Sequence, residues 1–102
     1  MVDLPPEHLQ EVKSILKDTI PQCEVRAFGS RVAGGAWKYS DLDLAIVGSG
    51  RIDWRTLEGL KDCFANSNLP IMVDILDWHS IAESFRQTIL SCCEVIQEGE
   101  PE

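Results

Sequence analysis

The segment that begins at Asp41 and reads DLDLAIV constrains the fold more than any other part of this chain. Its even-numbered positions are large and apolar, whereas Asp41, Asp43 and Ala45 occupy odd-numbered positions. Because successive side chains of a strand point to opposite faces, the segment predicts a strand over residues 41–47 with one buried face. Both carboxylates then leave the other face, with Cα atoms roughly 7 Å apart at a rise of about 3.3 Å per residue.

Helices and strands are predicted to alternate along the rest of the chain. Segments with apolar residues three and four apart predict helices, and short apolar runs bounded by Gly, Pro or Asn predict strands. The predicted helices cover residues 5–19, a short stretch within 30–36, residues 54–66 and a stretch after Ser80; the predicted strands cover residues 23–28, 41–47, 71–76 and 94–97. This order predicts an α/β or α+β fold in which helices flank a small mixed sheet.

Capping residues are predicted at two helix starts. Asp53 precedes the third helix and is expected to accept a backbone N–H in its first turn. Ser80 and Glu83 have the spacing of a capping box and are expected to begin the last helix. Asp77 lies between the preceding strand and that helix, so we expect it to cap rather than to bind metal.

Length and charge narrow the classes of function. A chain of 102 residues fits a single domain over residues 1–102, with a frayed tail expected at 98–102. No apolar run approaches the roughly 20 residues that span a bilayer, and the N-terminus lacks the features of a signal peptide. We therefore expect no membrane segment and a cytoplasmic location.

A net charge of −8 argues against direct binding of duplex nucleic acid. Binding of a nucleotide together with divalent cations is compatible with this charge.

A glycine-rich turn precedes the strand that carries the two acids. Gly29 and Gly34 flank the start of a short predicted helix, where backbone N–H groups and the Ser30 hydroxyl can donate to phosphate oxygens. Alternatively, Ser30 is only a helix cap. Arg31 either pairs with a triphosphate or is a surface charge, and Ser40 either orients the carboxylates or ends the loop.

A third carboxylate, Asp74, lies within the apolar run Ile71–Leu76. An ionised side chain in a buried strand needs a metal, a donor or a cation, so we expect Asp74 to join Asp41 and Asp43. Three such carboxylates can hold the two Mg²⁺ ions used in phosphoryl and nucleotidyl transfer. Alternatively, Asp74 lies on an edge strand, Asp41 caps a turn and Asp43 is a solvated strand residue.

These motifs together resemble those of the polymerase-β-type nucleotidyltransferase superfamily, in particular its minimal nucleotidyltransferases. The resemblance covers about residues 25–96 and is carried by Gly29-Ser30-Arg31, Gly34, Ser40-Asp41-x-Asp43 and the later Asp74. It implies that Gly29 and Ser30 hold the triphosphate and that Asp41, Asp43 and Asp74 bind two Mg²⁺ ions. Relatives often carry glycine near Cys93, which this chain lacks.

The resemblance also implies a partner. Short members are typically paired with a HEPN-domain toxin, and some neutralise it by transferring AMP from ATP to a tyrosine of that partner. A chain of this length is also expected to lack a second wall for the base and acceptor, and an acidic surface suits a basic partner. We therefore expect a Mg²⁺-dependent antitoxin that nucleotidylates its HEPN partner.

Two other functions are compatible with the sequence. One is nucleotidyl transfer to a small molecule, although enzymes of that kind usually carry an added domain. The other is a binding module that masks a toxin by contact alone, with the acids kept as a metal-braced scaffold.

Overall fold

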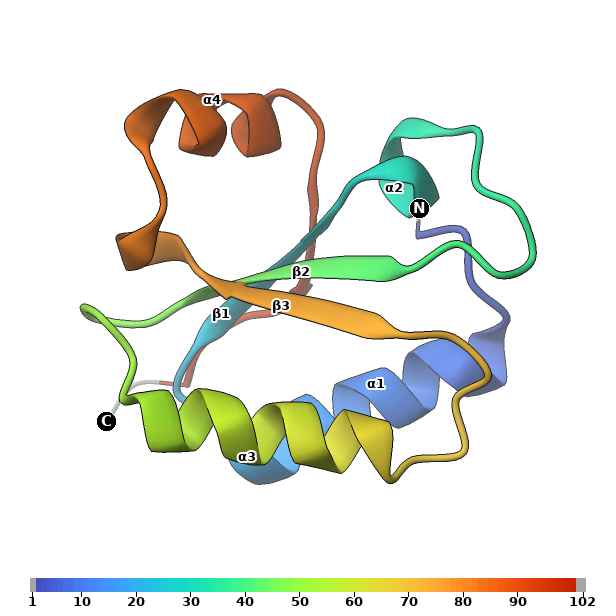
Figure 1. Ribbon diagram of the computed structural model, residues 1–102, viewed down its shortest axis with the longest axis horizontal. Helices are drawn as coiled ribbons and strands as arrows, with labels where there is room; N and C mark the ends of the chain where they lie inside the picture. Colours follow the sequence, from blue (N-terminus) through green and yellow to red (C-terminus); the bar gives the residue numbers. More distant parts are fainter. Residues whose placement is uncertain (1, 101–102) are drawn as a thin grey trace.

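The computed structural model describes residues 2–100, which form one four-stranded sheet with helices on both faces (Figure 1). The strands are β1 (Glu24–Phe28), β2 (Leu42–Val47), β3 (Val73–Asp77) and β4 (Glu94–Gln97). The helices are α1 (Pro6–Thr19), α2 (Ser30–Ala33), α3 (Trp54–Ala65) and α4 (Glu83–Ser91), with a 3₁₀ turn η1 (Trp78–Ser80). The fold is therefore α+β with a mixed sheet, as the sequence predicts.

The strand order is β3-β2-β1-β4, so β3 and β4 are the two edges. β1 runs antiparallel to β2 and to β4, whereas β2 and β3 are parallel. A parallel pair needs a long crossover, and α3 supplies it. Asp53 caps this helix by accepting the Arg55 N–H at 3.0 Å, which confirms its predicted role.

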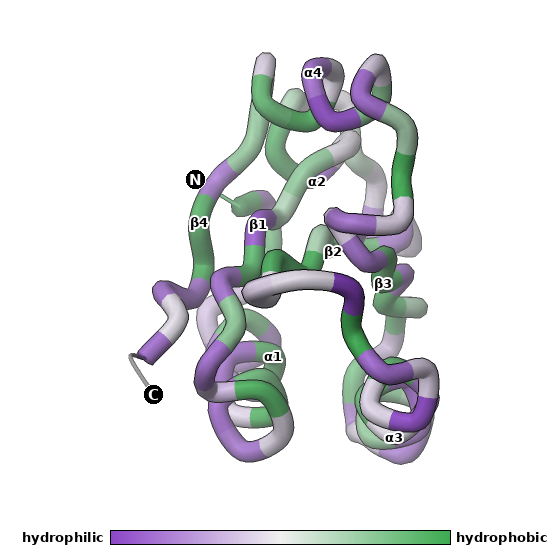
Figure 2. The backbone as a smooth tube through the Cα atoms, turned by 90° about the vertical axis from the view of Figure 1, so that its left-hand side faces the viewer, coloured by the Kyte–Doolittle hydropathy of each residue, from purple (hydrophilic) through white to green (hydrophobic). Residues whose placement is uncertain are grey.

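The strand β2 separates two hydrophobic clusters, one on each face of the sheet. Leu42, Leu44 and Ile46 lie in the larger cluster, which α1 and α3 cover. Ala45 lies in the smaller one with Trp78 and Ile89, under α4. Figure 2 shows the two layers of helices, with α1 and α3 on one side and α2 and α4 on the other. The predicted alternation of β2 is thus confirmed.

The β3 strand differs from its prediction in position and burial. It begins at Val73 and ends at Asp77, two residues later than expected at its start. Because β3 is a sheet edge, Asp74 is exposed, so the argument that its charge is buried is wrong. Asp77 is the buried acid of this strand, and it caps η1 by accepting the His79 N–H at 3.0 Å.

The predicted capping box at α4 is wrong. The helix is preceded by Ala82, with no side-chain cap, and Ser80 belongs to η1. The Ser80 hydroxyl donates to the Asp77 carboxylate at 3.1 Å. An acceptor at the end of β3 therefore takes the hydroxyl that the spacing assigns to the helix.

The C-terminal segment remains in contact with the body as far as Glu100. The Glu100 N–H donates to the Pro21 carbonyl at 3.0 Å. Fraying of the tail from residue 98 stays a prediction. Residues 101 and 102 lie outside the described residues. Within residues 2–100, no helix is both long enough and apolar enough to cross a bilayer.

Candidate active site

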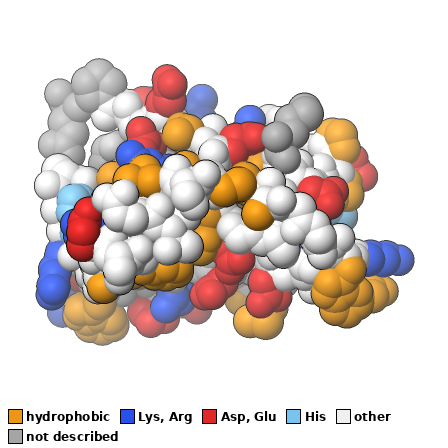
Figure 3. Space-filling view, turned by 90° about the horizontal axis from the view of Figure 1, so that it is seen from above, with side chains coloured by type: hydrophobic (Ala, Val, Ile, Leu, Met, Phe, Trp, Pro, Cys, Tyr) orange, Lys and Arg blue, Asp and Glu red, His pale blue; other side chains and the backbone are white. Residues whose placement is uncertain are grey.

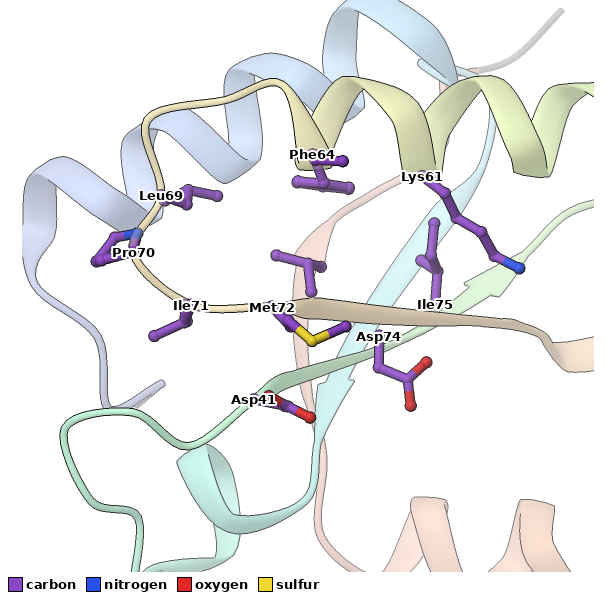
Figure 4. A pocket seen from close by; sticks show the side chains of 11 residues that line it. Asp41, Lys61, Phe64, Leu69, Pro70, Ile71, Met72, Asp74 and Ile75 are labelled. Atoms are coloured by element: carbon purple, nitrogen blue, oxygen red, sulfur yellow. The ribbon is translucent and has the colours of Figure 1, made fainter.

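Two adjacent strands bring the three predicted carboxylates together. Asp41 immediately precedes β2, Asp43 lies within it, and Asp43 is in direct register with Asp74 on β3. Neighbouring strands lie about 4.8 Å apart, so Asp43 and Asp74 leave the sheet side by side. Figure 4 shows the side chains of Asp41 and Asp74 pointing to the same side of the strands, away from α3.

The electrostatics of Asp43 reflect this convergence. Partial burial raises the pKa of the Asp43 carboxyl above its ordinary value, and the charges of Asp74 and Asp41 raise it further. Mutual repulsion of this kind favours a bound cation, because a cation lowers the energy of the ionised form. Figure 3 shows acidic side chains in the middle of the face that carries α2 and α4.

The glycine turn lies directly against Asp43. Gly29 has φ +79°, a backbone conformation that favours glycine. A Cβ built on Gly29 would overlap the Asp43 carboxylate, lying 3.2 Å from Cγ and closer still to Oδ2. Only glycine therefore lets the turn approach the carboxylate this closely, which places the start of α2 beside the acids.

Ser30 begins α2, immediately after Gly29. The N–H groups of Val32 and Ala33 donate to the Gly29 carbonyl, and the N–H of Gly34 donates to that of Ser30. The first N–H groups of a helix have no partner within it and point outward from its start. The structure thus sets possible phosphate donors next to the Asp43 carboxylate.

The Arg31 side chain is enclosed by the protein rather than open to solvent. It is only 5% exposed, and its guanidinium donates to four backbone carbonyls. The acceptors are Asp3 at 2.6 Å, Ser40 at 2.9 Å, Lys38 at 3.1 Å and Trp37 at 3.4 Å. The surface alternative is therefore wrong: Arg31 is buried and holds the loop that joins α2 to β2. Its contact with a triphosphate stays a prediction.

Ser40 also belongs to that loop. Its hydroxyl oxygen accepts the Trp37 N–H at 3.0 Å, and its carbonyl accepts from Arg31. Of the two roles considered for Ser40, these contacts favour ending the loop. Because Ser40 directly precedes Asp41, these contacts also hold the backbone next to that acid.

A pocket of about 720 Å³ adjoins the carboxylates at the edge of β3 (Figure 4). Its lining residues are Asp41, Lys61, Phe64, Ala65, Leu69, Pro70, Ile71, Met72, Val73, Asp74 and Ile75. It includes two of the three acids but not Gly29 or Ser30. It is therefore next to the glycine turn rather than part of it.

The sequence analysis did not identify this pocket. Met72 is 73% exposed and stands two residues before Asp74, so strand periodicity could have placed it near that acid. Nothing in the sequence pattern singles out Lys61, because it stands on α3, far along the chain from either acid.

The three acids supply the carboxylate oxygens that hard divalent cations bind. Mg²⁺ prefers carboxylate oxygens, and Asp43 experiences the repulsion that such an ion would relieve. As the side chains stand, residues 2–100 contain no group of three acidic, histidine or cysteine ligands able to hold a metal. Their side chains would have to rotate toward an ion, which exposed carboxylates such as Asp41 and Asp74 can do.

Comparison with known proteins agrees with this geometry. The family described as "Polymerase beta, Nucleotidyltransferase" matches residues 10–102. A Haemophilus influenzae protein named "Probable protein adenylyltransferase MntA" is 48% identical over 99 residues, which cover 97% of this chain and 87% of that protein.

Solved structures give the same result for the fold. A crystal structure described as a toxin-antitoxin with AMP-PNP matches with a TM-score of 0.74 and 25% identity, covering 90% of this chain and 73% of that one. A tri-AMPylated Shewanella oneidensis HEPN toxin in complex with MNT antitoxin matches with a TM-score of 0.60 and 20% identity, covering 92% and 71%. With its glycine turn against paired acids, this chain belongs to the polymerase-β-type nucleotidyltransferase family.

Proposed function

We propose that this nucleotidyltransferase transfers AMP from ATP to a hydroxyl group of a partner protein, a HEPN-domain toxin, and thereby acts as its antitoxin. The observation that carries the proposal is the row formed by Gly29, immediately after β1, Asp43 on β2 and Asp74 on β3. It sets a phosphate-binding turn beside two acids in register. The protein and structures described above support the choice of acceptor and partner, since their names refer to protein adenylylation and to HEPN toxins.

Each residue of the row has a distinct task in this reaction. Gly29 and Ser30 bind the triphosphate through backbone N–H groups and the Ser30 hydroxyl. Asp41, Asp43 and Asp74 would hold two Mg²⁺ ions, which supply charge neutralisation and activation of the acceptor hydroxyl. Arg31 and Ser40 keep the distance between the turn and Asp41 fixed through the loop contacts.

The reaction is a single in-line displacement. The acceptor oxygen forms a bond to the α-phosphorus of ATP, and the bond from that phosphorus to the bridging oxygen of the β-phosphate breaks. Pyrophosphate leaves, and the hydroxyl proton passes to the Asp74 carboxylate and then to water. The exposure of Asp74 at the sheet edge supports this last role, because the acid is open to both acceptor and solvent.

The size and charge of the chain support a protein acceptor in the cytoplasm. The acids lie on an open face, so a partner must supply the wall that encloses the nucleotide. A net charge of −8 favours a basic partner through long-range attraction. None of the cysteines within residues 2–100 forms a disulfide, which is usual for a reducing compartment.

Mass spectrometry of the two proteins tests the proposal. The chain and its HEPN partner are incubated with ATP and Mg²⁺, and the intact mass of the partner is measured. The wild type is expected to add AMP, whereas Asp41→Asn and Asp43→Asn variants are expected to lose transfer by about 10³-fold or more, as loss of metal-based charge stabilisation implies. Asp62→Asn, an exposed acid on α3, serves as the matched control.

The outcomes separate the proposal from a contact-only function. Transfer that persists in either site variant would contradict the proposed metal ligands. If the partner stays bound and inhibited without any added mass, the chain masks its partner by contact alone.

A further inference from the structure

A second hollow lies beside the pocket at the β3 edge. It has a volume of about 290 Å³ and is lined in part by Leu4, Trp37 and Tyr39. Pro70 and Ile71 line both hollows, so the two are neighbours at this linker. We call the two hollows together, from Lys61 through the 69–72 linker to the 36–39 loop, the edge groove.

Large hydrophobic side chains are exposed along the edge groove. Met72 is 73% exposed, Trp37 65% and Tyr39 55%, and all three line it. Neighbouring exposed apolar residues mark interaction sites, and Trp and Tyr are enriched among the residues that dominate binding energy. The groove thus has the composition of a protein-binding surface.

The geometry of the reaction indicates which reactant reaches this groove. In an in-line displacement, the attacking and leaving oxygens stand on opposite sides of the phosphorus. The glycine turn, where the leaving phosphates bind, contacts Asp43 from the β1 side. The acceptor must therefore approach from the opposite side, where Asp74 and the edge groove lie.

We propose that the edge groove binds the segment of the partner protein that carries the acceptor hydroxyl, an inference that rests on the proposed function. The acceptor side chain reaches the carboxylates at Asp41 and Asp74, which line one end of the groove. Apolar side chains of the same segment pack against Met72, Trp37 and Tyr39. Lys61 and Lys38 line the groove, so acidic groups of the bound segment are favoured next to these two lysines. Basic groups of the segment are favoured next to Asp41 and Asp74.

The open edge of β3 adds a second means of binding. β3 has a neighbour on one side only, so its outer main-chain groups face the groove side of the sheet. An extended segment can pair with such an edge while its alternate side chains enter pockets. This arrangement would hold an acceptor in register with Asp74.

Variants of the groove test the inference. Met72→Glu and Trp37→Ala alter exposed side chains, so the fold is expected to survive. Trp54→Ala is the matched control, because Trp54 is 67% exposed but begins α3 and lines neither hollow. For each variant, the Kd for the HEPN partner, the KM for that partner in AMP transfer and the Kd for a non-hydrolysable ATP analogue are measured.

The groove variants are expected to raise the partner's Kd and KM by about ten-fold, the effect of losing one interface anchor of about 1.4 kcal/mol. Binding of the ATP analogue is expected to change less than about two-fold, and Trp54→Ala is expected to match the wild type. Unchanged partner binding and transfer in both groove variants would overturn the inference. So would a selective loss of ATP binding, which would assign the groove to the nucleotide base.

Failure of the proposed function gives a different pattern. If the wild type transfers no AMP but the groove variants still weaken partner binding, the groove is a docking surface and transfer is refuted. If the wild type transfers AMP and the groove variants bind and modify the partner as the wild type does, the proposed transfer is supported and the groove assignment is refuted.

Discussion

At the scale of single residues, Asp43 is the most constrained acid of the site. It is partly buried, it stands in register with Asp74, and the Gly29 backbone lies against its carboxylate. The partial burial and the neighbouring charge of Asp74 both disfavour a negative charge on Asp43 when no cation is present. The residue is therefore retained at a cost in stability, which is common for groups that bind metal or substrate.

The raised pKa of Asp43 predicts how stability depends on pH. The folded state keeps the Asp43 proton to a higher pH than the unfolded chain, whose ordinary value is 3.8. The charge of Asp43 therefore lowers wild-type stability progressively as pH rises from about 3.8 through the raised pKa, and this loss persists at pH 7. Asp43→Asn carries no charge and should escape that loss.

Thermal unfolding in EDTA at pH 4 and pH 7 measures this effect. At pH 7 the Asp43→Asn variant is expected to unfold about 1–3 °C above the wild type, a small gain because the partly exposed carboxyl is screened by solvent. The difference should shrink toward pH 4, and Asp62→Asn should show none. A variant that is equal to or less stable than the wild type at pH 7 would contradict this account.

Residue identities in the site were more predictable than residue environments. The alternation around Asp41 and Asp43 follows from the sequence because strand periodicity is local. The edge position of Asp74 does not follow from the sequence, since a short apolar run is compatible with a central strand and with a strand covered on one face. Burial of Arg31 was also not predictable, because its acceptors lie as far away as Asp3.

At the scale of elements, the structure follows the sequence where the signals are long or local. The helix over α1, the capped start of α3 and the strand β2 all form close to their predicted bounds. The capping box failed because the acceptor on Asp77, set by tertiary position, competes for the Ser80 hydroxyl. The order of strands across the sheet is a tertiary property that no single segment encodes.

The loop between α2 and β2 depends on one side chain. Arg31 donates to four carbonyls that lie on the N-terminal segment and on residues 37–40. A guanidinium presents five donors in a planar fork, whereas a lysine ammonium presents three from one point. Neither Arg31→Lys nor Arg31→Gln can therefore satisfy all four acceptors.

Denaturant unfolding and steady-state kinetics measure the role of Arg31. Arg31→Gln is expected to lower the free energy of unfolding by about 2–3 kcal/mol, since the charged hydrogen bonds of a buried guanidinium are lost. Arg31→Lys should lose less. Because the loop also positions the glycine turn, the KM for ATP should rise in the folded variants at a temperature where both remain native.

Arg55→Gln is the control, because Arg55 is exposed on α3 and its guanidinium stacks over Trp54. It is expected to change stability by less than about 0.5 kcal/mol. If Arg31→Gln behaved like this control, Arg31 would not organise the loop.

At the scale of the whole molecule, the two faces of the sheet have different roles. The face under α1 and α3 holds the larger hydrophobic cluster and supplies most of the core. The opposite face holds a smaller cluster under α4, and the acids Asp41 and Asp74 are exposed. The larger cluster thus fixes the strands, while the face that carries the site contributes less to the core.

This division predicts that ions and nucleotide stabilise the whole domain. The radius of gyration of 12.8 Å is close to the roughly 13 Å of a compact domain of 100 residues, so unfolding is expected to be a single cooperative transition. A ligand that binds only the native state then stabilises every element at once, by about 2.7 kcal/mol at a hundred-fold excess over its Kd. The measurement is Tm with EDTA, with Mg²⁺, and with Mg²⁺ plus a non-hydrolysable ATP analogue.

The wild type is expected to gain stability in that order, with NaCl at matched ionic strength as the control for screening of its charge of −8. The Asp41→Asn/Asp43→Asn double variant should respond to Mg²⁺ no more than to NaCl, because its two neutral amides bind the cation weakly. Equal gains from Mg²⁺ in the wild type and the double variant would mean that the cation only screens the net charge. A gain confined to the wild type would instead tie the stability of the entire fold to cation binding at Asp41 and Asp43.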